Sequence, residues 1–158
     1  MYVNCLFRLM VAMHRSRKGS VDWYDDLLCW QEAVVLCEYV YTLCDQAWIP
    51  LDDEFACRWY LASLNISWKI AYAYGPEDIS WFLERLPAAS KYAAETVFWS
   101  WVALQKWYIT ATQYNTCVAH VESIRSKISS ICHYLERYWI EEQASWKLLF
   151  RSSAASFE

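Results

Sequence analysis

Residues that break helices are scarce in this chain, and this scarcity limits the folds that it can adopt. Only two Gly and three Pro occur among 158 residues. Gly and Pro are the residues that interrupt helices most strongly. Between them, no stretch alternates apolar and polar residues as a half-buried strand does. The sequence therefore predicts an all-α fold built from long helices.

The few breakers divide the chain into segments. They are Gly19, Pro50, Gly75-Pro76 and Pro87. This division predicts helices at about residues 2–14, 22–48, 53–74, 77–86, 88–113 and 116–150, the last broken near Trp139. A chain of this length suits one core, so we expect an N-terminal helix and linker over residues 1–20 and one helical domain over 21–158.

Two segments differ in how their apolar residues are spread. The last segment has one apolar face at spacings of three and four residues, made by Val121, Ile124, Ile128, Ile131, Leu135 and Tyr138. Such a helix is half-buried. Residues 97–104 are apolar almost all round, which a helix tolerates when neighbours enclose it. The sequence therefore predicts that residues 97–104 belong to a buried central helix.

Charge and cysteine content exclude several functional classes. A net charge of −4 gives no basic face for nucleic acid. The longest apolar run, 97–109, is too short for a membrane span and contains Gln105 and Lys106. Seven Cys, an odd number without a Cys-x-x-Cys pair, are typical of reduced thiols in the cytoplasm.

Catalytic and metal-binding patterns are sparse. Two glycines cannot build a Gly-rich phosphate loop. Cys117 and His120 are three residues apart and could share a metal, but no second pair completes a tetrahedral site, so we interpret them as structural. Acidic clusters are explained as helix caps and solvated faces. We expect no enzymatic activity and no cofactor or metal, with a helical enzyme or metal protein as an open alternative.

Residues 139–150 carry a recognisable pattern. They resemble the second homology motif of the Bcl-2 family of apoptosis regulators, in which Trp-Ile precedes a second Trp by seven positions. Trp139, Ile140 and Trp146 match this spacing. Ala144-Ser145 replaces the usual Gly-Gly.

Two upstream segments extend the resemblance in the same order. Trp99 and Ser100 match the family's first motif, but Phe98 and Trp101 stand where the family has Asn and Arg. The four apolar positions of the third motif correspond to Cys57, Leu61, Leu64 and Trp68, without the diagnostic Gly and Asp. Such divergence is typical of viral members of the family.

The resemblance implies a Bcl-2-like helical bundle with a buried central helix and a surface groove. The groove would be lined by Leu61, Leu64, Trp68, Tyr72, Phe98, Trp101, Leu104 and Tyr108. Structural roles would belong to Trp99, Ser100, Trp139, Ile140 and Trp146. In the family a groove Arg pairs with an Asp of the ligand. Because Trp101 cannot do so, Arg85, Lys91 or Lys106 is expected to substitute.

These features together predict a survival-promoting protein that binds the amphipathic death-motif helices of pro-apoptotic relatives. The loss of the Gly-Asp pair indicates that the chain receives such helices and does not donate one. The expected location is the cytoplasm or the mitochondrial outer membrane. One alternative is a Bcl-2-fold inhibitor of inflammatory signalling that uses another surface, and another is an unrelated helical interaction protein. The many aromatic residues also make a homodimer plausible.

Overall fold

The computed structural model describes residues 26–47, 53–74 and 79–154, with the backbone alone at 79, 138, 139 and 141–154. No strand occurs in these ranges, so the all-α prediction is confirmed for this part of the chain. The predicted helix at 2–14 and the linker to residue 20 lie outside the described residues, as do the breakers at Pro50 and Gly75-Pro76.

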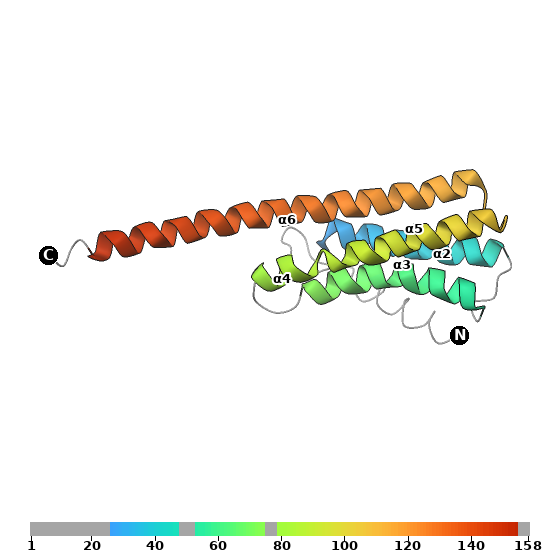
Figure 1. Cartoon of the computed structure of the whole chain (residues 1–158), viewed down its shortest axis with the longest axis horizontal. Coiled ribbons are helices and arrows are strands. Elements are labelled where there is room, and N and C mark those ends of the chain that lie inside the picture. The colour runs from blue at the N-terminus through green and yellow to red at the C-terminus, as the bar shows by residue number, and fades with distance from the viewer. Residues whose placement is uncertain (1–25, 48–52, 75–78, 155–158) are drawn as a thin grey trace.

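Four long helices and one short helix make up the described fold. They are α2 (Leu28–Gln46), α3 (Glu54–Ala73), α4 (Ile79–Arg85), α5 (Ala88–Gln105) and α6 (Ala111–Ala154). Figure 1 shows the long helices lying alongside one another. α2 packs against α3, α3 against α5, α5 against α6, and α6 back against α2. The result is a four-helix bundle, with the short α4 packed against α3 and α6.

The start of α3 agrees with its sequence signal. Asp53 has an extended backbone, and its carboxylate accepts hydrogen bonds from the backbone N–H groups of Phe55 (2.9 Å) and Ala56 (3.4 Å). These N–H groups have no partner within the helix, so an N-terminal Asp stabilises the first turn. The predicted start at residue 53 is confirmed.

The end of α5 differs from the prediction, because the helix stops at Gln105 and not near residue 113. The backbone N–H of Tyr108 donates to the carbonyl of Ala103 (3.0 Å), and that of Trp107 donates to the carbonyl of Leu104 (3.1 Å). This pair of bonds defines a Schellman motif, whose left-handed position favours glycine. Trp107 occupies that position with φ 60°. The usual glycine signal for a helix end is therefore missing from the sequence.

The start of α6, at Ala111 and not at 116, follows from a reciprocal cap. The backbone N–H of Thr110 donates to Oε1 of Gln113 (2.8 Å), and the N–H of Gln113 donates to Oγ1 of Thr110 (3.2 Å). Thr-x-x-Gln is a capping box, in which each side chain satisfies the other residue's free N–H. This cap sets the start of α6, which could not be located from Gly or Pro because neither occurs near it.

The core is built from large residues of α2, α3 and α6 and from small residues of α5. Fully buried side chains include Leu36, Val40, Trp59, Ile66, Ile70 and Ile124. The buried residues of α5 are Ala89, Ala93, Thr96, Ser100 and Ala103. The expected enclosure of residues 97–104 is wrong, since Phe98 and Trp101 are exposed. α5 turns its small side inward, and its bulky aromatic residues consequently remain at the surface.

The apolar face predicted for α6 is confirmed as far as the bundle extends. Val121, Ile124 and Ile128 are buried, and Ile131 and Leu135 are half-buried. The predicted break near Trp139 is absent, since α6 continues as one helix to Ala154. Nothing in residues 111–154 resembles a helix stop, because the segment contains neither Gly nor Pro.

We expect Trp107→Gly to raise the free energy of unfolding by about 0.5–1 kcal/mol. The left-handed conformation costs a residue with a side chain about 1–2 kcal/mol, and the flexibility that Gly gives the unfolded chain offsets part of the gain. Little packing is lost, since Trp107 is 92% exposed. Urea denaturation measures the change. Gln105→Gly, inside the last turn of α5, is the matched control and should lower stability by about 1 kcal/mol. If Trp107→Gly and Gln105→Gly changed the free energy of unfolding equally, the backbone at Trp107 would not be strained.

Candidate protein-binding surface

The outer side of α3 carries the residues expected from the third homology motif to line a groove. Leu61, Trp68 and Tyr72 are exposed, Trp68 to 58%, and Leu64 is half-buried. The inner side of the same helix forms the core. These four residues recur at helical spacing over three turns of α3 and form a continuous apolar row. We call Leu61, Leu64, Trp68 and Tyr72 the α3 stripe.

The outer side of α5 forms a second exposed aromatic area. Phe98 is 54% exposed, and its ring lies 6.4 Å from that of Trp101, measured between centroids. Tyr108, in the turn after α5, is also exposed. Leu104 differs from these three, because it is half-buried and packs against the core. We call Phe98, Trp101 and Tyr108 the α5 surface.

The structure joins the α3 stripe to α4. The ring centroids of Tyr72 and Trp81 lie 6.3 Å apart, and Trp81 is 36% exposed. The α3 stripe therefore continues onto α4, whereas the α5 surface belongs to α5 and the turn that follows it. Eight residues expected in one groove are thus divided between two exposed areas, with Leu104 in neither.

Of the residues expected to have structural roles, Ser100 is best placed for one. The indole N–H of Trp59 donates to Oγ of Ser100 (3.0 Å), and that hydroxyl donates to the carbonyl of Thr96 (2.8 Å). All three residues are fully buried. A buried indole N–H without an acceptor would cost about 1–3 kcal/mol, so Ser100 stabilises the contact between α3 and α5.

The other residues expected to be structural occupy different environments. Trp99 is half-buried and packs its ring edge-on against Phe55 of α3, with centroids 5.9 Å apart. Ile140 is exposed on α6. Trp139 and Trp146 lie on the helical backbone of α6, but their side chains are outside the described part of the structure.

Three cations were expected to replace the missing groove Arg, and they lie in different places. Arg85 stacks on the ring of Trp81, with its guanidinium carbon 3.4 Å from the centroid, and lies 5.5 Å from the ring of Tyr72. Lys106 lies 5.8 Å from the ring of Tyr108, beside the α5 surface. Lys91 is exposed on α5. Of these three cations, Arg85 borders the α3 stripe, where Lys69 also lies 5.8 Å from the ring of Tyr72.

A polar cluster that the sequence did not reveal joins α2 to α6. One carboxylate oxygen of Glu32 lies 2.7 Å from Nδ1 of His120, and the other accepts a hydrogen bond of 2.8 Å from Nζ of Lys127. Lys127 also donates to Oγ of Ser123 (2.7 Å). Glu32 is 88 and 95 residues from its two partners, so no local spacing could have indicated the cluster.

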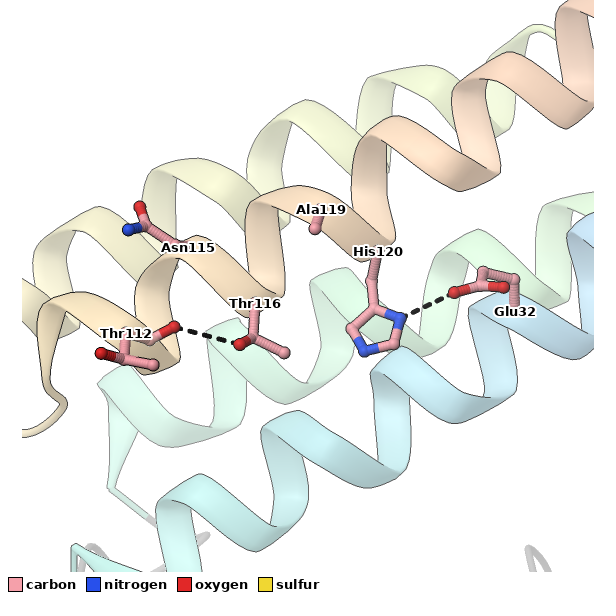
Figure 2. A pocket seen from close by; sticks show the side chains of 6 residues that line it. All are labelled: Glu32, Thr112, Asn115, Thr116, Ala119 and His120. Carbon is pink, nitrogen blue, oxygen red and sulfur yellow. Dashed lines mark hydrogen bonds and ion pairs between the residues drawn. The ribbon is translucent and has the colours of Figure 1, made fainter.

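A shallow pocket opens beside this cluster. Figure 2 shows His120 and Glu32 facing each other across the seam between α6 and α2, while the rest of the pocket comes from the first turns of α6. Those residues are Thr112, Asn115, Thr116 and Ala119. The hydroxyl of Thr116 donates to the carbonyl of Thr112 (3.0 Å) and is thereby engaged within its own helix. We call Glu32, His120 and Lys127 the interhelical clamp; the hydroxyl groups of Thr112 and Thr116 line the pocket beside it.

The clamp changes the ionisation of Glu32. The hydrogen bond from Lys127, followed by the interaction with His120, lowers the pKa of Glu32 below its ordinary value of 4.5. The carboxylate is therefore ionised at neutral pH and holds two partners on the opposite helix. Such partly buried, hydrogen-bonded ion pairs contribute more to stability than pairs in open solvent.

The cysteines are placed as small apolar residues. Cys29, Cys37, Cys44 and Cys117 are buried, and burial raises the pKa of each of these thiols to about 11. Such thiols stay protonated at neutral pH and react slowly. Within the described ranges, no three His, Cys, Asp or Glu side chains gather as metal ligands would. Nδ1 of His120 is engaged with Glu32, and Cys117 is fully buried.

Comparison with known proteins gives no relative for this chain. No family model, no curated protein and no solved structure matches it. Among the helices that the structure describes, none combines the length and the hydropathy needed to cross a membrane.

We expect Glu32→Gln to lower the free energy of unfolding by about 1–2 kcal/mol at pH 7, because the charge-assisted bonds to Lys127 and His120 are weakened. The pKa of Glu32 is lower in the folded protein than its ordinary value of 4.5, which applies to the unfolded chain. The ionised carboxylate therefore contributes its full stabilisation above pH 4.5. This stabilisation is lost as the pH falls through the lowered pKa of the folded state. Denaturation of both proteins between pH 7 and pH 3 tests this expectation.

Glu38→Gln is the matched control for this experiment, since Glu38 lies on the same helix and is exposed. It should change stability by less than about 0.5 kcal/mol at every pH. A difference between wild type and Glu32→Gln that persists undiminished at pH 3 would show that the clamp does not depend on the carboxylate charge.

Proposed function

We propose that this protein acts by binding another protein through the α3 stripe, and that its partner is an amphipathic helix of a pro-apoptotic protein. The proposed role is that of a survival-promoting, Bcl-2-like protein without enzymatic activity. The observation that carries the proposal is the α3 stripe itself, where two aromatic residues and a leucine are exposed on a helix whose other side is core. Contiguous exposed apolar side chains on a small domain are typical of protein-binding sites.

The dimensions of the α3 stripe suit a helical ligand. From Leu61 to Tyr72 the stripe extends over 11 residues, or about 16 Å at 1.5 Å per residue. An amphipathic helix that binds through residues i, i+4 and i+7 presents anchors over about 10 Å. Two to three ligand anchors can therefore contact the stripe at once.

Two cations lie beside the α3 stripe, Arg85 at 5.5 Å and Lys69 at 5.8 Å from the ring of Tyr72. The guanidinium of Arg85 lies against Trp81 and near Tyr72, and its Nε is buried without a hydrogen-bond acceptor among the described residues. Stacking on aromatic rings leaves the edge of a guanidinium free for a carboxylate. We propose that Arg85 pairs with an acidic residue of the ligand, in the role that Trp101 cannot fill.

The α5 surface favours a second candidate function. Phe98, Trp101 and Tyr108 are exposed on α5 and in the turn after it, whereas the α3 stripe is on α3. A Bcl-2-like inhibitor of inflammatory signalling would use such a surface to bind a signalling protein. The two functions differ in which exposed area the partner needs.

The proposed compartment is the cytoplasm, since the six described cysteines are free and mostly buried, as is usual in a reducing environment. The mitochondrial outer membrane is the site where the proposed partners would be met.

The proposal is tested by titrating the purified protein with a panel of pro-apoptotic helix peptides. We expect a dissociation constant below 1 μM for at least one peptide, equivalent to about −8 kcal/mol. Trp68→Ala should weaken that binding by a factor of about 30 or more, because large aromatic anchors dominate such interfaces. Arg85→Gln should weaken it less, and only for peptides that contain the acidic residue.

Leu28→Ala is the matched control, because Leu28 is 64% exposed and belongs to α2, not to the helix that carries the α3 stripe. Its affinity should equal that of wild type. If no peptide binds a well-folded sample, the apoptotic function is excluded. Binding that Phe98→Ala abolishes and Trp68→Ala leaves intact would transfer the proposal to the α5 surface.

A further inference from the structure

The last helix is much longer than the bundle to which it belongs. Among the described side chains, Ile131 and Cys132 are the last of α6 that pack against the core, and Leu135 beyond them is half-buried, yet the helix continues to Ala154. The segment from His133 to Ala154, which we call the α6 extension, spans about 33 Å at 1.5 Å per residue. Figure 1 shows it running past the ends of the other helices. Tyr134 and Ile140, both within it, are 69% and 65% exposed.

The α6 extension does not have the sequence of a helix that stands alone in water. A solvated single helix is polar on all sides. The extension instead contains several large apolar residues, namely Tyr134, Leu135, Tyr138, Trp139, Ile140, Trp146, Leu148, Leu149 and Phe150. Among them, Leu135, Trp139, Trp146 and Phe150 follow one another at intervals of four, seven and four residues, which is a helical period. A helix with this pattern gains most of its stability by packing against a partner.

The distribution of charge indicates what that partner is. The first part of the extension, 136–142, holds three acidic residues and one Arg, a net charge of −2. The second part, 143–154, holds Lys147 and Arg151 and no acid, a net charge of +2. Two copies lying antiparallel would place each negative half against a positive half, centred near Ala144. Two parallel copies would place like charges together.

We propose that the α6 extension pairs antiparallel with the α6 extension of a second copy, so that the protein is a two-fold symmetric dimer. In a two-fold dimer the same surface of each chain contacts its copy, so one self-complementary surface covers the apolar residues of both chains. This is the commonest arrangement of homodimers. The contact between the two extensions would be about as long as α2, a helix of 19 residues that packs against α6 within the bundle. The two contacts of α6 would therefore be similar in length. The α3 stripe and the α5 surface lie on other helices and stay accessible in this dimer.

The test is the mass of the full-length protein in solution, measured by light scattering and sedimentation at concentrations on the order of 1–100 μM, where specific interfaces of moderate strength associate. We expect a particle of twice 18.8 kDa. The variants Glu141→Lys/Glu142→Lys and Lys147→Glu/Arg151→Glu should each raise the dissociation constant on the order of tenfold or more, because like charges then oppose each other. Mixed in equal amounts, the two variants should form a heterodimer.

Glu38→Lys/Glu95→Lys is the matched control, since it makes the same change in charge at exposed positions of α2 and α5. It should dimerise as wild type does. Helix content by circular dichroism identifies any variant that has failed to fold. A wild-type protein that stays monomeric throughout this range would overturn the proposal. A dimer that both charge variants leave unchanged would also overturn it, because the contact would then lie elsewhere.

Discussion

The close contact between α3 and α5 is the constraint on which the rest of the bundle depends. α5 approaches α3 with small side chains, and the indole of Trp59 fills the space opposite them, with its N–H bonded to Ser100. When the small residues of α5 face the core, the residues on the opposite side of the helix must face the solvent. Phe98 and Trp101 lie on the remaining side and are exposed for that reason. The exposed aromatic area of α5 is thus a consequence of how its inner face packs.

A second constraint acts at the seam between α2 and α6. The side chains of Gln46 and Gln113 meet near one end (3.5 Å), and Glu32 binds Lys127 towards the other. These polar contacts agree with the register that the interlocking buried side chains of the two antiparallel helices impose, and the contact of Glu32 with Lys127 adds direction to it. α2 begins at Leu28 and so covers only the first part of α6, whose backbone continues past the ends of the other helices (Figure 1).

Much of the fold could be predicted from the sequence, and the failures share a physical cause. The scarcity of Gly and Pro indicated helices, Asp53 marked the start of α3, and the spacing of Val121, Ile124 and Ile128 identified the inner face of α6. These signals are local. The end of α5 was missed because Trp107 adopts a conformation that favours glycine. The clamp at Glu32 depends on helices far apart in sequence, which no local pattern encodes. The exposure of Phe98 was missed because the inner face of α5 is made of small residues and not of its aromatic ones.

The α6 extension gives the sequence resemblance a physical alternative. Trp139, Ile140 and Trp146 suggested a motif that would pack within its own chain, but α6 carries all three positions beyond the bundle. The same residues cannot both pack on the core of their own chain and pair with a second copy. Evidence for the antiparallel dimer would therefore weaken the part of the family resemblance that rests on residues 139–150. The α3 stripe is unaffected by that choice, because residues 61–72 are held by α2 and α5 and not by the end of α6.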